Sequence, residues 1–375
     1  MNRSNSVPLS FEALEDGLSI SFTNEISYRI NGGAWETLLA GENTEEVNKG
    51  SMISFRHSKS IGITGTVGQF SINKKCNVSG VCSSITPKFL GEKHMMSNLF
   101  QYLFYDCDTI VDASKLELPA TTLADSCYNC MFGGCTSLTT APKLPATALA
   151  NYCYENMFYG CISLTTLPKL PATILAKSCY SSMFRDCTSL TTAPELPATT
   201  LADSCYSSMF ANCESLTTAP ELPATTLAKS CYDRMFFACR TLTAIPSILP
   251  AISLKESCYA SMFKGCSSLT TAPELPATTL KAKCYSAMFH DCTSLTTAPE
   301  LPAYVLEEDC YYSMFSHCLK LSYIKAMFVT VPGESFTFSW VIGVSSTGTF
   351  VKNKRATWNV IGVDGVPSGW TIKTE

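Results

Sequence analysis

The sequence predicts an α+β solenoid, a stack of about nine coils of 26 residues in which each coil pairs a short strand with a short helix. Two observations lead to this fold class. A unit of the form Cys-Tyr-x-x-Met-Phe-x-x-Cys-x-Ser-Leu-Thr-Thr-Ala-Pro-x-Leu-Pro recurs through the middle of the chain. Apolar residues make up 46% of the 375 residues and charged residues only 15%, a balance typical of a continuous buried core rather than of a disordered chain.

The first cysteine of the unit sets the register of the repeat. It recurs in steps of 26 residues, with a single step of 27 between Cys231 and Cys258. Its positions are Cys127, Cys153, Cys179, Cys205, Cys231, Cys258, Cys284 and Cys310. A degenerate unit with Leu99, Leu103 and Cys107 precedes them. Because one unit cannot bury its apolar face alone, the units are expected to stack and to align identical residues in columns.

Each unit divides into two halves with different periodicity. Its first half is apolar at positions i, i+1, i+4, i+5 and i+8, which predicts a short helix. In one unit these residues are Cys179, Tyr180, Met183, Phe184 and Cys187. The following segment, Ser189 to Pro194, alternates and contains threonine, which predicts a short strand. Pro194 and Pro197 cannot donate backbone hydrogen bonds and are expected to end it.

The repeat resembles the BspA-like leucine-rich repeats of bacterial surface proteins. The residues that carry the resemblance are Met209-Phe210, Cys213, Ser215-Leu216 and Leu222-Pro223, and the pattern recurs through about residues 96–325. The resemblance implies the leucine-rich repeat architecture and a role in adhesion or host interaction, and similar repeats occur in gut bacteria and their phages. The spacer Pro-Ala-Thr-Thr-Leu-Ala departs from the common unit of that family.

The two ends of the chain read as all-β regions. Residues 1–88 contain short alternating runs, and Asn31-Gly32-Gly33 between two of them predicts a hairpin, so an Ig-like sandwich of about seven strands is expected. Tyr28 or Trp35 could bind a sugar there, although packing in the core or bracing of the hairpin is the simpler role. The solenoid is assigned to residues 89–325. Residues 326–375 hold three of the four tryptophans and are expected to form a small β cap over the last coil.

Little in the sequence indicates catalysis or a cofactor. The two cysteines that recur in each repeat, which we call the ladder cysteines, are expected to be buried thiols rather than disulfides. A disulfide between the second cysteines of neighbouring repeats stays possible. Cys127 and Cys130 form a lone C-x-x-C pair, whereas zinc needs a second pair, so we expect no metal. Four scattered histidines, the lack of a paired nucleophile and base, and the lack of a glycine-rich phosphate loop predict no enzyme and no cofactor.

If the invariant positions build the core, the positions that vary between units are the exposed ones. Stacking would align them into a ribbon of aromatic and charged groups, the side chains that binding hot spots favour. A merely solvated face is the competing interpretation. The candidate ligand-binding residues are Tyr159, Arg185, Phe237, Lys264, His290 and Tyr312.

These features predict a non-catalytic recognition or adhesion protein that binds a protein or glycan at a bacterial cell surface. A net charge of −4 without a Lys/Arg run argues against nucleic acid as partner, and no apolar run is long enough to span a membrane. The first six residues lack the apolar core of a secretory signal. Two alternatives therefore stay open: a phage virion component such as a tail or receptor-binding protein, and glycan binding through the N-terminal sandwich. The oligomeric state stays undetermined.

Overall fold

The computed structural model describes residues 7–58, 65–87 and 95–375. The chain divides into two compact units, Met1–Ala172 with Asp186–Leu190, and Thr173–Arg185 with Thr191–Glu375. We call them the N-terminal and the C-terminal unit and describe each by itself.

The N-terminal unit begins with two β-sheets. The larger has the order β4-β3-β5-β1-β7-β8 and the smaller pairs β2 with β6. The strands are β1 (Leu9–Ala13), β2 (Ile20–Phe22), β3 (Ile26–Ile30), β4 (Glu36–Leu38), β5 (Met52–Arg56), β6 (Phe70–Ile72), β7 (Cys76–Val81) and β8 (Ile110–Glu117). Phe70 of the small sheet contacts Phe11 and Phe55 of the large one, each with ring centroids 5.1 Å apart, so aromatic side chains from both sheets share one core. The short 3-10 helix η2 (Cys82–Ile85) follows β7.

The predicted hairpin is present between β3 and β4. The two strands pair antiparallel, with Ile26 opposite Leu38. Residues 31–35 connect them, and in this loop Asn31 and Gly32 have φ values of 47° and 77°, the left-handed backbone that favours hairpin turns.

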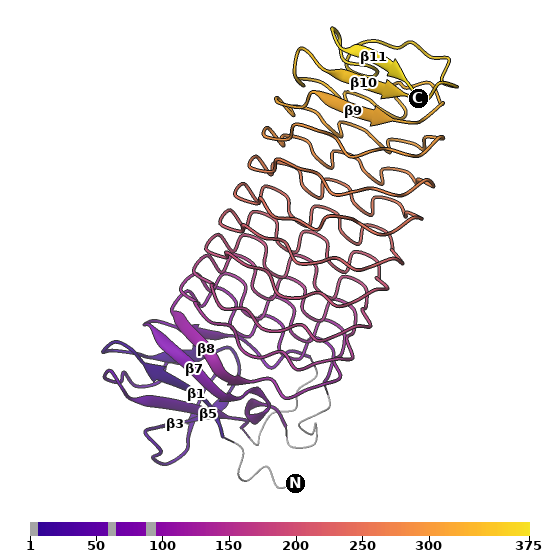
Figure 1. The fold of residues 1–375 in the computed structure, drawn as a ribbon. Coiled ribbons are helices and arrows are strands. Elements are labelled where there is room, and N and C mark those ends of the chain that lie inside the picture. Colours follow the sequence, from indigo (N-terminus) through magenta and orange to yellow (C-terminus); the bar gives the residue numbers. More distant parts are fainter. Residues whose placement is uncertain (1–6, 59–64, 88–94) are drawn as a thin grey trace. The chain divides into compact units, whose positions relative to one another are not determined.

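The large sheet continues into the repeat region of the same unit. β7 pairs with β8 in parallel, and β8 belongs to the degenerate unit (Figure 1). Asp112 of β8 then forms a parallel bridge to Thr140, which bridges Thr166 in turn. In this unit the first coils therefore run parallel to β8 at the edge of the large sheet. The predicted boundary between residues 88 and 89 lies outside the described residues and stays a prediction.

The prediction of a short helix in each 26-residue repeat is wrong. No α-helix occurs within residues 7–58, 65–87 and 95–375 (Figure 1). Instead, the segment that ends at the second cysteine is a run of tight turns, which we call the turn segment, and consecutive turn segments bond to each other. In the coil of Cys205, every second amide donates to the carbonyl three residues earlier, as Met209 N does to Tyr206 O at 3.2 Å. The amides between them donate to the next coil, as Tyr206 N does to Cys231 O at 3.0 Å.

This alternation satisfies every amide from Ser204 to Cys213, half of them locally and half in the next coil. It requires a left-handed residue at every fourth position. In the coil of Cys205 those residues are Ser204, Ser208 and Asn212, with φ values of 53°, 53° and 61°. The turn segment thus has a repeat of four residues, and it needs the neighbouring coil to complete its hydrogen bonds.

At a left-handed position, replacing alanine by glycine should have the opposite effect on stability from the same change in a helix. Ala238 has a φ of 55°, where a Cβ atom is strained. Ala238→Gly is therefore expected to stabilise the protein by up to about 1 kcal/mol, whereas the same change inside a helix would cost about 1 kcal/mol. Urea unfolding measures the difference. Ala282→Gly, at a position of the turn segment outside the left-handed set, is the matched control and should destabilise; destabilisation by Ala238→Gly would contradict the turn assignment.

The predicted strands are present, but within the coils they are single parallel bridges. In the C-terminal unit Thr192 bridges Thr218, which bridges Ala244. A second column, in the Thr-Thr-Leu segment, joins Thr200 to Thr226. These threonines are exposed, whereas the adjacent leucines are buried: Leu216 precedes the threonines of the first column and Leu227 follows those of the second. In the first column, the coil of Cys205 thus contributes Leu216 to the core and Thr217 and Thr218 to the surface.

Columns of identical aromatic rings fill the core of the coils. In the C-terminal unit the tyrosine rings stack from Tyr180 to Tyr311 with centroids 5.6 to 6.1 Å apart. The phenylalanine rings stack in the same way from Phe184 to Phe315 at 5.7 to 5.9 Å. Offset stacking at these separations is favourable beyond the burial of area.

The second cysteine of each unit ties its coil to the one before. Its Sγ–H donates to the carbonyl oxygen of the phenylalanine in the preceding coil at 3.0 to 3.2 Å. Cys239, for example, donates to Phe210 O at 3.1 Å. The invariant thiol is therefore both a small apolar group and a second donor to a buried carbonyl, because Phe210 O, for example, also accepts from Cys213 N at 3.1 Å.

The last residues of the C-terminal unit extend the stack. β9 (Tyr323–Ala326), β10 (Thr349–Lys352) and β11 (Thr371–Thr374) form a parallel three-stranded sheet in the order β11-β10-β9 (Figure 1). Trp340 is completely buried and stacks on Tyr311, the last tyrosine of the column, with centroids 6.2 Å apart. Trp358 stacks on Phe328 at 5.2 Å. Two of the tryptophans thus close the aromatic columns.

Candidate recognition surface

The turn segments carry the predicted ligand-binding residues on their outer side. Five of the six lie six residues after the first cysteine, next to a left-handed position, and Tyr312 lies two residues after Cys310. Tyr159 and Tyr312 are 37% and 39% exposed and Arg185 is exposed, whereas Phe237, Lys264 and His290 are half-buried. Within each unit, consecutive turn segments are hydrogen-bonded, so residues one repeat apart become neighbours.

In the C-terminal unit the aromatic part of this surface centres on Tyr312. Its ring stacks on that of Phe338 in the next coil, with centroids 5.6 Å apart and planes 18° from parallel. Phe338 is also 39% exposed. The sequence analysis missed Phe338 because it lies beyond the clear repeat. Extending the register by one step of 26 residues from Tyr312 would have found it.

In the N-terminal unit a second aromatic group lies on the turn segments. Tyr102 and Tyr105 meet edge to face at 5.5 Å, and Tyr102 is 43% exposed. A side chain on Gly133 would come 3.0 Å from the Tyr105 ring, so this glycine leaves room for the ring. The charge on Asp106, burial, and the nearby groups of Cys130, Tyr102 and Tyr159 raise the pKa of Tyr105. Tyr105 occupies the same column as Tyr159, in the degenerate unit.

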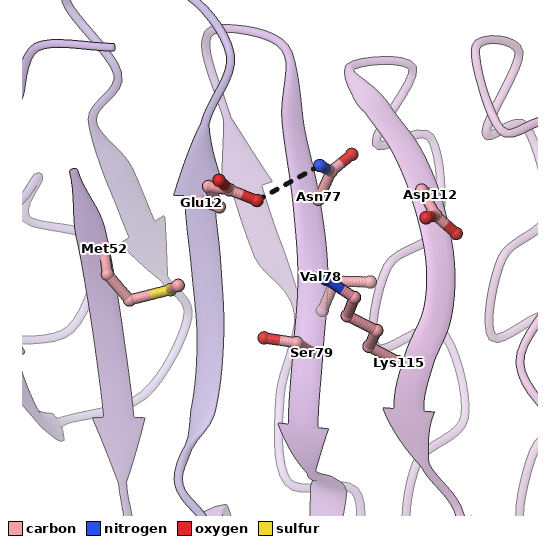
Figure 2. A pocket seen from close by; sticks show the side chains of 7 residues that line it. All are labelled: Glu12, Met52, Asn77, Val78, Ser79, Asp112 and Lys115. Atoms are coloured by element: carbon pink, nitrogen blue, oxygen red, sulfur yellow. Dashed lines mark hydrogen bonds between the residues drawn. The ribbon is translucent and has the colours of Figure 1, made fainter. Parts of the chain in front are cut away.

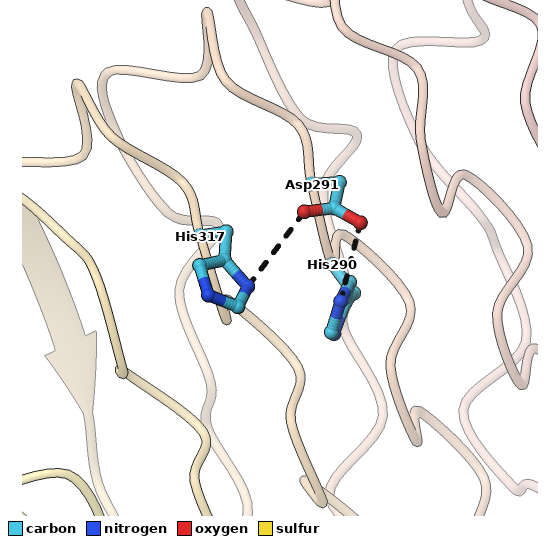
Figure 3. A group of neighbouring side chains, drawn as sticks. All are labelled: His290, Asp291 and His317. Carbon is cyan, nitrogen blue, oxygen red and sulfur yellow. Dashed lines mark ion pairs between the residues drawn. The ribbon is translucent and has the colours of Figure 1, made fainter.

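A charged cluster lies on adjacent coils of the C-terminal unit (Figure 3). His290 Nε2 is 3.2 Å from Asp291 Oδ2, and His317 Nδ1 is 3.7 Å from Asp291 Oδ1. The two imidazole rings meet edge to face with centroids 5.5 Å apart. Burial, followed by the Lys264 ammonium group, lowers the pKa of His290 despite the nearby Asp291 carboxylate. The structure therefore brings together two of the predicted residues, Lys264 and His290, with two that the sequence analysis had not chosen.

A small depression lies on the large sheet of the N-terminal unit (Figure 2). It is lined by Glu12, Met52, Asn77, Val78, Ser79, Asp112 and Lys115. Asn77 Nδ2 donates to Glu12 Oε2 at 3.3 Å. The volume is about 70 Å³, well below the roughly 300 Å³ at which small-molecule pockets begin. This depression can hold a few water molecules, so the exposed columns remain the better candidate surface.

Residues 97–243 and 203–339 match the family described as "BspA type Leucine rich repeat region", with six copies of the repeat. The chain belongs to the BspA-type leucine-rich repeat family. The resemblance carried by Met209-Phe210, Cys213 and Leu222-Pro223 is confirmed, and proteins of this family are generally surface-associated binding and adhesion proteins.

Two further comparisons add context. A solved structure of a leucine-rich repeat protein from Bacteroides ovatus is 15% identical over 94% of this chain and 98% of that chain, with a TM-score of 0.30. A search of curated proteins found no match. In the part of the chain that the structure describes, we find no helix with the length and apolarity needed to cross a membrane.

In this BspA-type protein, the two N-terminal aromatic residues considered for sugar binding contact other side chains of the same sheet. Tyr28 is only 7% exposed, and its hydroxyl donates to Glu36 Oε2 at 3.0 Å. The Trp35 ring lies against two guanidinium groups, 4.6 Å from Arg29 and 4.1 Å from Arg56. Both side chains therefore brace the strands around the hairpin, which favours the simpler of the two roles.

Ser316 and His317 are the residues of this BspA-type coil that most resemble a catalytic pair. Ser316 Oγ lies 3.2 Å from His317 Nδ1. However, Ser316 is 2% exposed, and the same ring nitrogen also faces Asp291. A nucleophile–histidine–acid triad uses opposite ring nitrogens for the nucleophile and the acid. The arrangement does not activate a nucleophile.

The cysteines of the BspA-type coils remain thiols. No disulfide forms among the cysteines of the described residues, and all except Cys130 are buried. Cys130 is half-buried at a left-handed position with a φ of 52°. Burial, followed by the charge on Glu155, raises its pKa to about 11.

Iodoacetamide at pH 7.5 is therefore expected to modify the native protein at Cys130 alone, and slowly, since a thiol with a raised pKa is mostly protonated there. Mass spectrometry of the intact protein should show a single adduct, which Cys130→Ser abolishes. Several adducts without denaturant would show that the columns of buried thiols open to solvent.

Proposed function

We propose that this protein is a non-catalytic recognition and adhesion protein that binds a protein or glycan ligand with the outer columns of its turn segments, at a bacterial cell surface. Its membership of a family of surface-associated binding proteins supports the class. The observation that carries the proposed site is the stacked pair of Tyr312 and Phe338, two aromatic rings that are each 39% exposed.

An exposed stacked pair is suited to binding for physical reasons. Aromatic side chains supply a large rigid contact area at low cost in conformational entropy, and they dominate binding hot spots. Sugar rings and peptide side chains both pack on flat aromatic faces. The pair lies on backbone held by cross-coil bonds, such as Ser313 N to Phe338 O at 2.8 Å, so its geometry is fixed before a ligand arrives.

The experiment compares variants of the full chain on a glycan array and on a panel of immobilised extracellular-matrix proteins. Loss of both rings in Tyr312→Ser/Phe338→Ser is expected to weaken the dominant interaction at least tenfold, or by about 1.4 kcal/mol. The matched control is Ser286→Ala, which changes the residue in the column of Tyr312 one coil earlier. Unchanged binding by the double variant would reject this site.

The same assay separates the alternative of glycan binding by the N-terminal sheets. Trp35→Ala should leave binding unchanged if the turn segments form the site. Loss of glycan binding in Trp35→Ala, with retention in the double variant, would place the ligand on the N-terminal sheets instead. No feature of the described residues favours the virion role over the cell-surface role.

A further inference from the structure

We propose that His290, Asp291 and His317 form a three-ligand site for a divalent transition-metal ion, and that zinc is the ion that these donors fit. The site rests on its own geometry and does not require the ligand-binding role of the surface around it.

The donor atoms are already gathered at nearly the separation that a metal ion requires. One ligand atom from each residue lies within 4.8 Å of the others. The two nearest contacts are 3.2 Å, from His290 Nε2 to Asp291 Oδ2, and 3.7 Å, from His317 Nδ1 to Asp291 Oδ1 (Figure 3). Zinc ligands at about 2.0–2.2 Å in tetrahedral geometry lie roughly 3.4 Å from each other. To bind the ion, the half-exposed His317 ring would have to turn and give up its contact with Ser316, whose Oγ lies 3.2 Å from Nδ1.

The donor set determines the class of ion. Two imidazole nitrogens and one carboxylate oxygen suit zinc and its first-row neighbours, whereas magnesium and calcium prefer oxygen ligands alone. A metal-ligating histidine must be neutral, and the partly buried His290 faces the carboxylate with Nε2. Three protein ligands leave at least one coordination position open for water or for a group of a bound partner.

The backbone holds the donors in place before any ion binds. Asp291 and His317 occupy the same left-handed position in consecutive coils, with φ values of 60° and 59°. Backbone bonds join these turn segments, including Asp291 N to Ser316 O at 2.9 Å. The site therefore depends on the register of the repeat, and for this reason no linear motif reveals it. The Lys264 ammonium group, whose charge acts on His290, opposes the binding of a cation here.

The experiment titrates metal-stripped full-length protein with Co²⁺ and with Zn²⁺. One equivalent is expected to bind, and the cobalt complex should show the visible bands of nitrogen and oxygen ligands without thiolate-to-cobalt charge transfer. Asp291→Asn and His317→Asn should each weaken binding at least tenfold. Asparagine tolerates the left-handed backbone, so both variants should keep the fold. His57→Asn and Cys130→Ser are controls that should bind like the wild type.

A second measurement is independent of the variants. Zn²⁺ added to the wild-type protein should shift the ring resonances of two of its four histidines. The proposal is wrong if both asparagine variants bind Zn²⁺ with unchanged affinity, or if Zn²⁺ does not shift the ring resonances of His290 and His317. Either result would show that the cluster is an ion-pair network without a metal. A thiolate charge-transfer band that disappears in Cys130→Ser would assign the bound metal to Cys130 and overturn the proposal.

Discussion

Above about pH 9 the protein is expected to unfold cooperatively within a narrow pH interval. Burial raises the pKa of the ladder thiols, and for Cys107, Cys127 and Cys239 it raises the pKa to about 12. The same thiols in an unfolded chain have a pKa of about 8.5. Because the folded pKa is the higher one, the stabilisation is complete below about pH 8.5 and is lost as the pH rises toward the folded value.

The size of the effect follows from the number of buried thiols. Each thiol that is protonated in the folded protein and ionised in the unfolded chain removes about 1.4 kcal/mol of unfolding free energy per pH unit. Ten such thiols would together remove roughly 14 kcal/mol per pH unit, which equals the whole stability of a typical domain, about 5–15 kcal/mol. Buried tyrosines such as Tyr128 and Tyr311, whose pKa values burial also raises, steepen the loss above pH 10.

Circular dichroism between pH 7 and pH 11, with thiolate and tyrosinate absorbance recorded together, measures this transition. All three signals should change at one midpoint, and Cys130→Ser should barely move it, because this thiol is one of many and only half-buried. If thiolate absorbance instead grows gradually near pH 8.5 while the backbone signal is retained, the thiols are exposed and the expectation fails.

The repeat, its register and its core could be predicted from the sequence because they depend only on which positions are apolar. Tyr206, Met209 and Phe210 are 1% exposed or less, as the invariant pattern indicates. The membership of the BspA-type family follows from the same residues. The hairpin at Asn31 and Gly32 was equally accessible, since a left-handed turn has a local residue signature.

The helix was wrong because apolar positions at i, i+1, i+4, i+5 and i+8 fit two structures. On a helix of 3.6 residues per turn this pattern drifts by about 40° every four residues, whereas turns that repeat every four residues keep it in line. The residues before the second cysteine held the deciding signal. They are largely Gly, Asn, Asp and His, which tolerate a left-handed backbone. They are Asp106, Gly134, Gly160, Asp186, Asn212, Ala238, Gly265, Asp291 and His317, all with positive φ.

The same positions explain what the sequence could and could not indicate about the surface. They vary between repeats and lie directly after five of the six candidate ligand-binding residues, but the left-handed backbone determines part of their composition. Contacts between coils, such as Tyr312 with Phe338, become visible only when the 26-residue register is extended past the obvious repeat. The cluster of His290, Asp291 and His317 needed, in addition, the direction in which each side chain points.

Replacing Trp340 by alanine is expected to unfold the last coils of the C-terminal unit. The side chain is completely buried, and its Nε1 donates to Gly365 O at 2.9 Å. Its ring contacts Tyr311, Phe315 and Phe328, which end the aromatic columns. Loss of a buried tryptophan costs about 3–5 kcal/mol, and the orphaned Gly365 carbonyl adds about 1–3 kcal/mol.

That cost should be local because each coil of a repeat protein contacts only its neighbours. When the last interface is weakened by this much, the end is expected to open before the interior does. Hydrogen exchange in Trp340→Ala should therefore show lost protection in β10 and β11 and retained protection around Tyr206 and Tyr232. Trp35→Ala, which removes only a half-buried ring between Arg29 and Arg56, should cost less than about 1 kcal/mol. Uniform loss of protection throughout the unit would instead mean that its coils unfold as one, and that Trp340 contributes to the whole stack rather than closing its end.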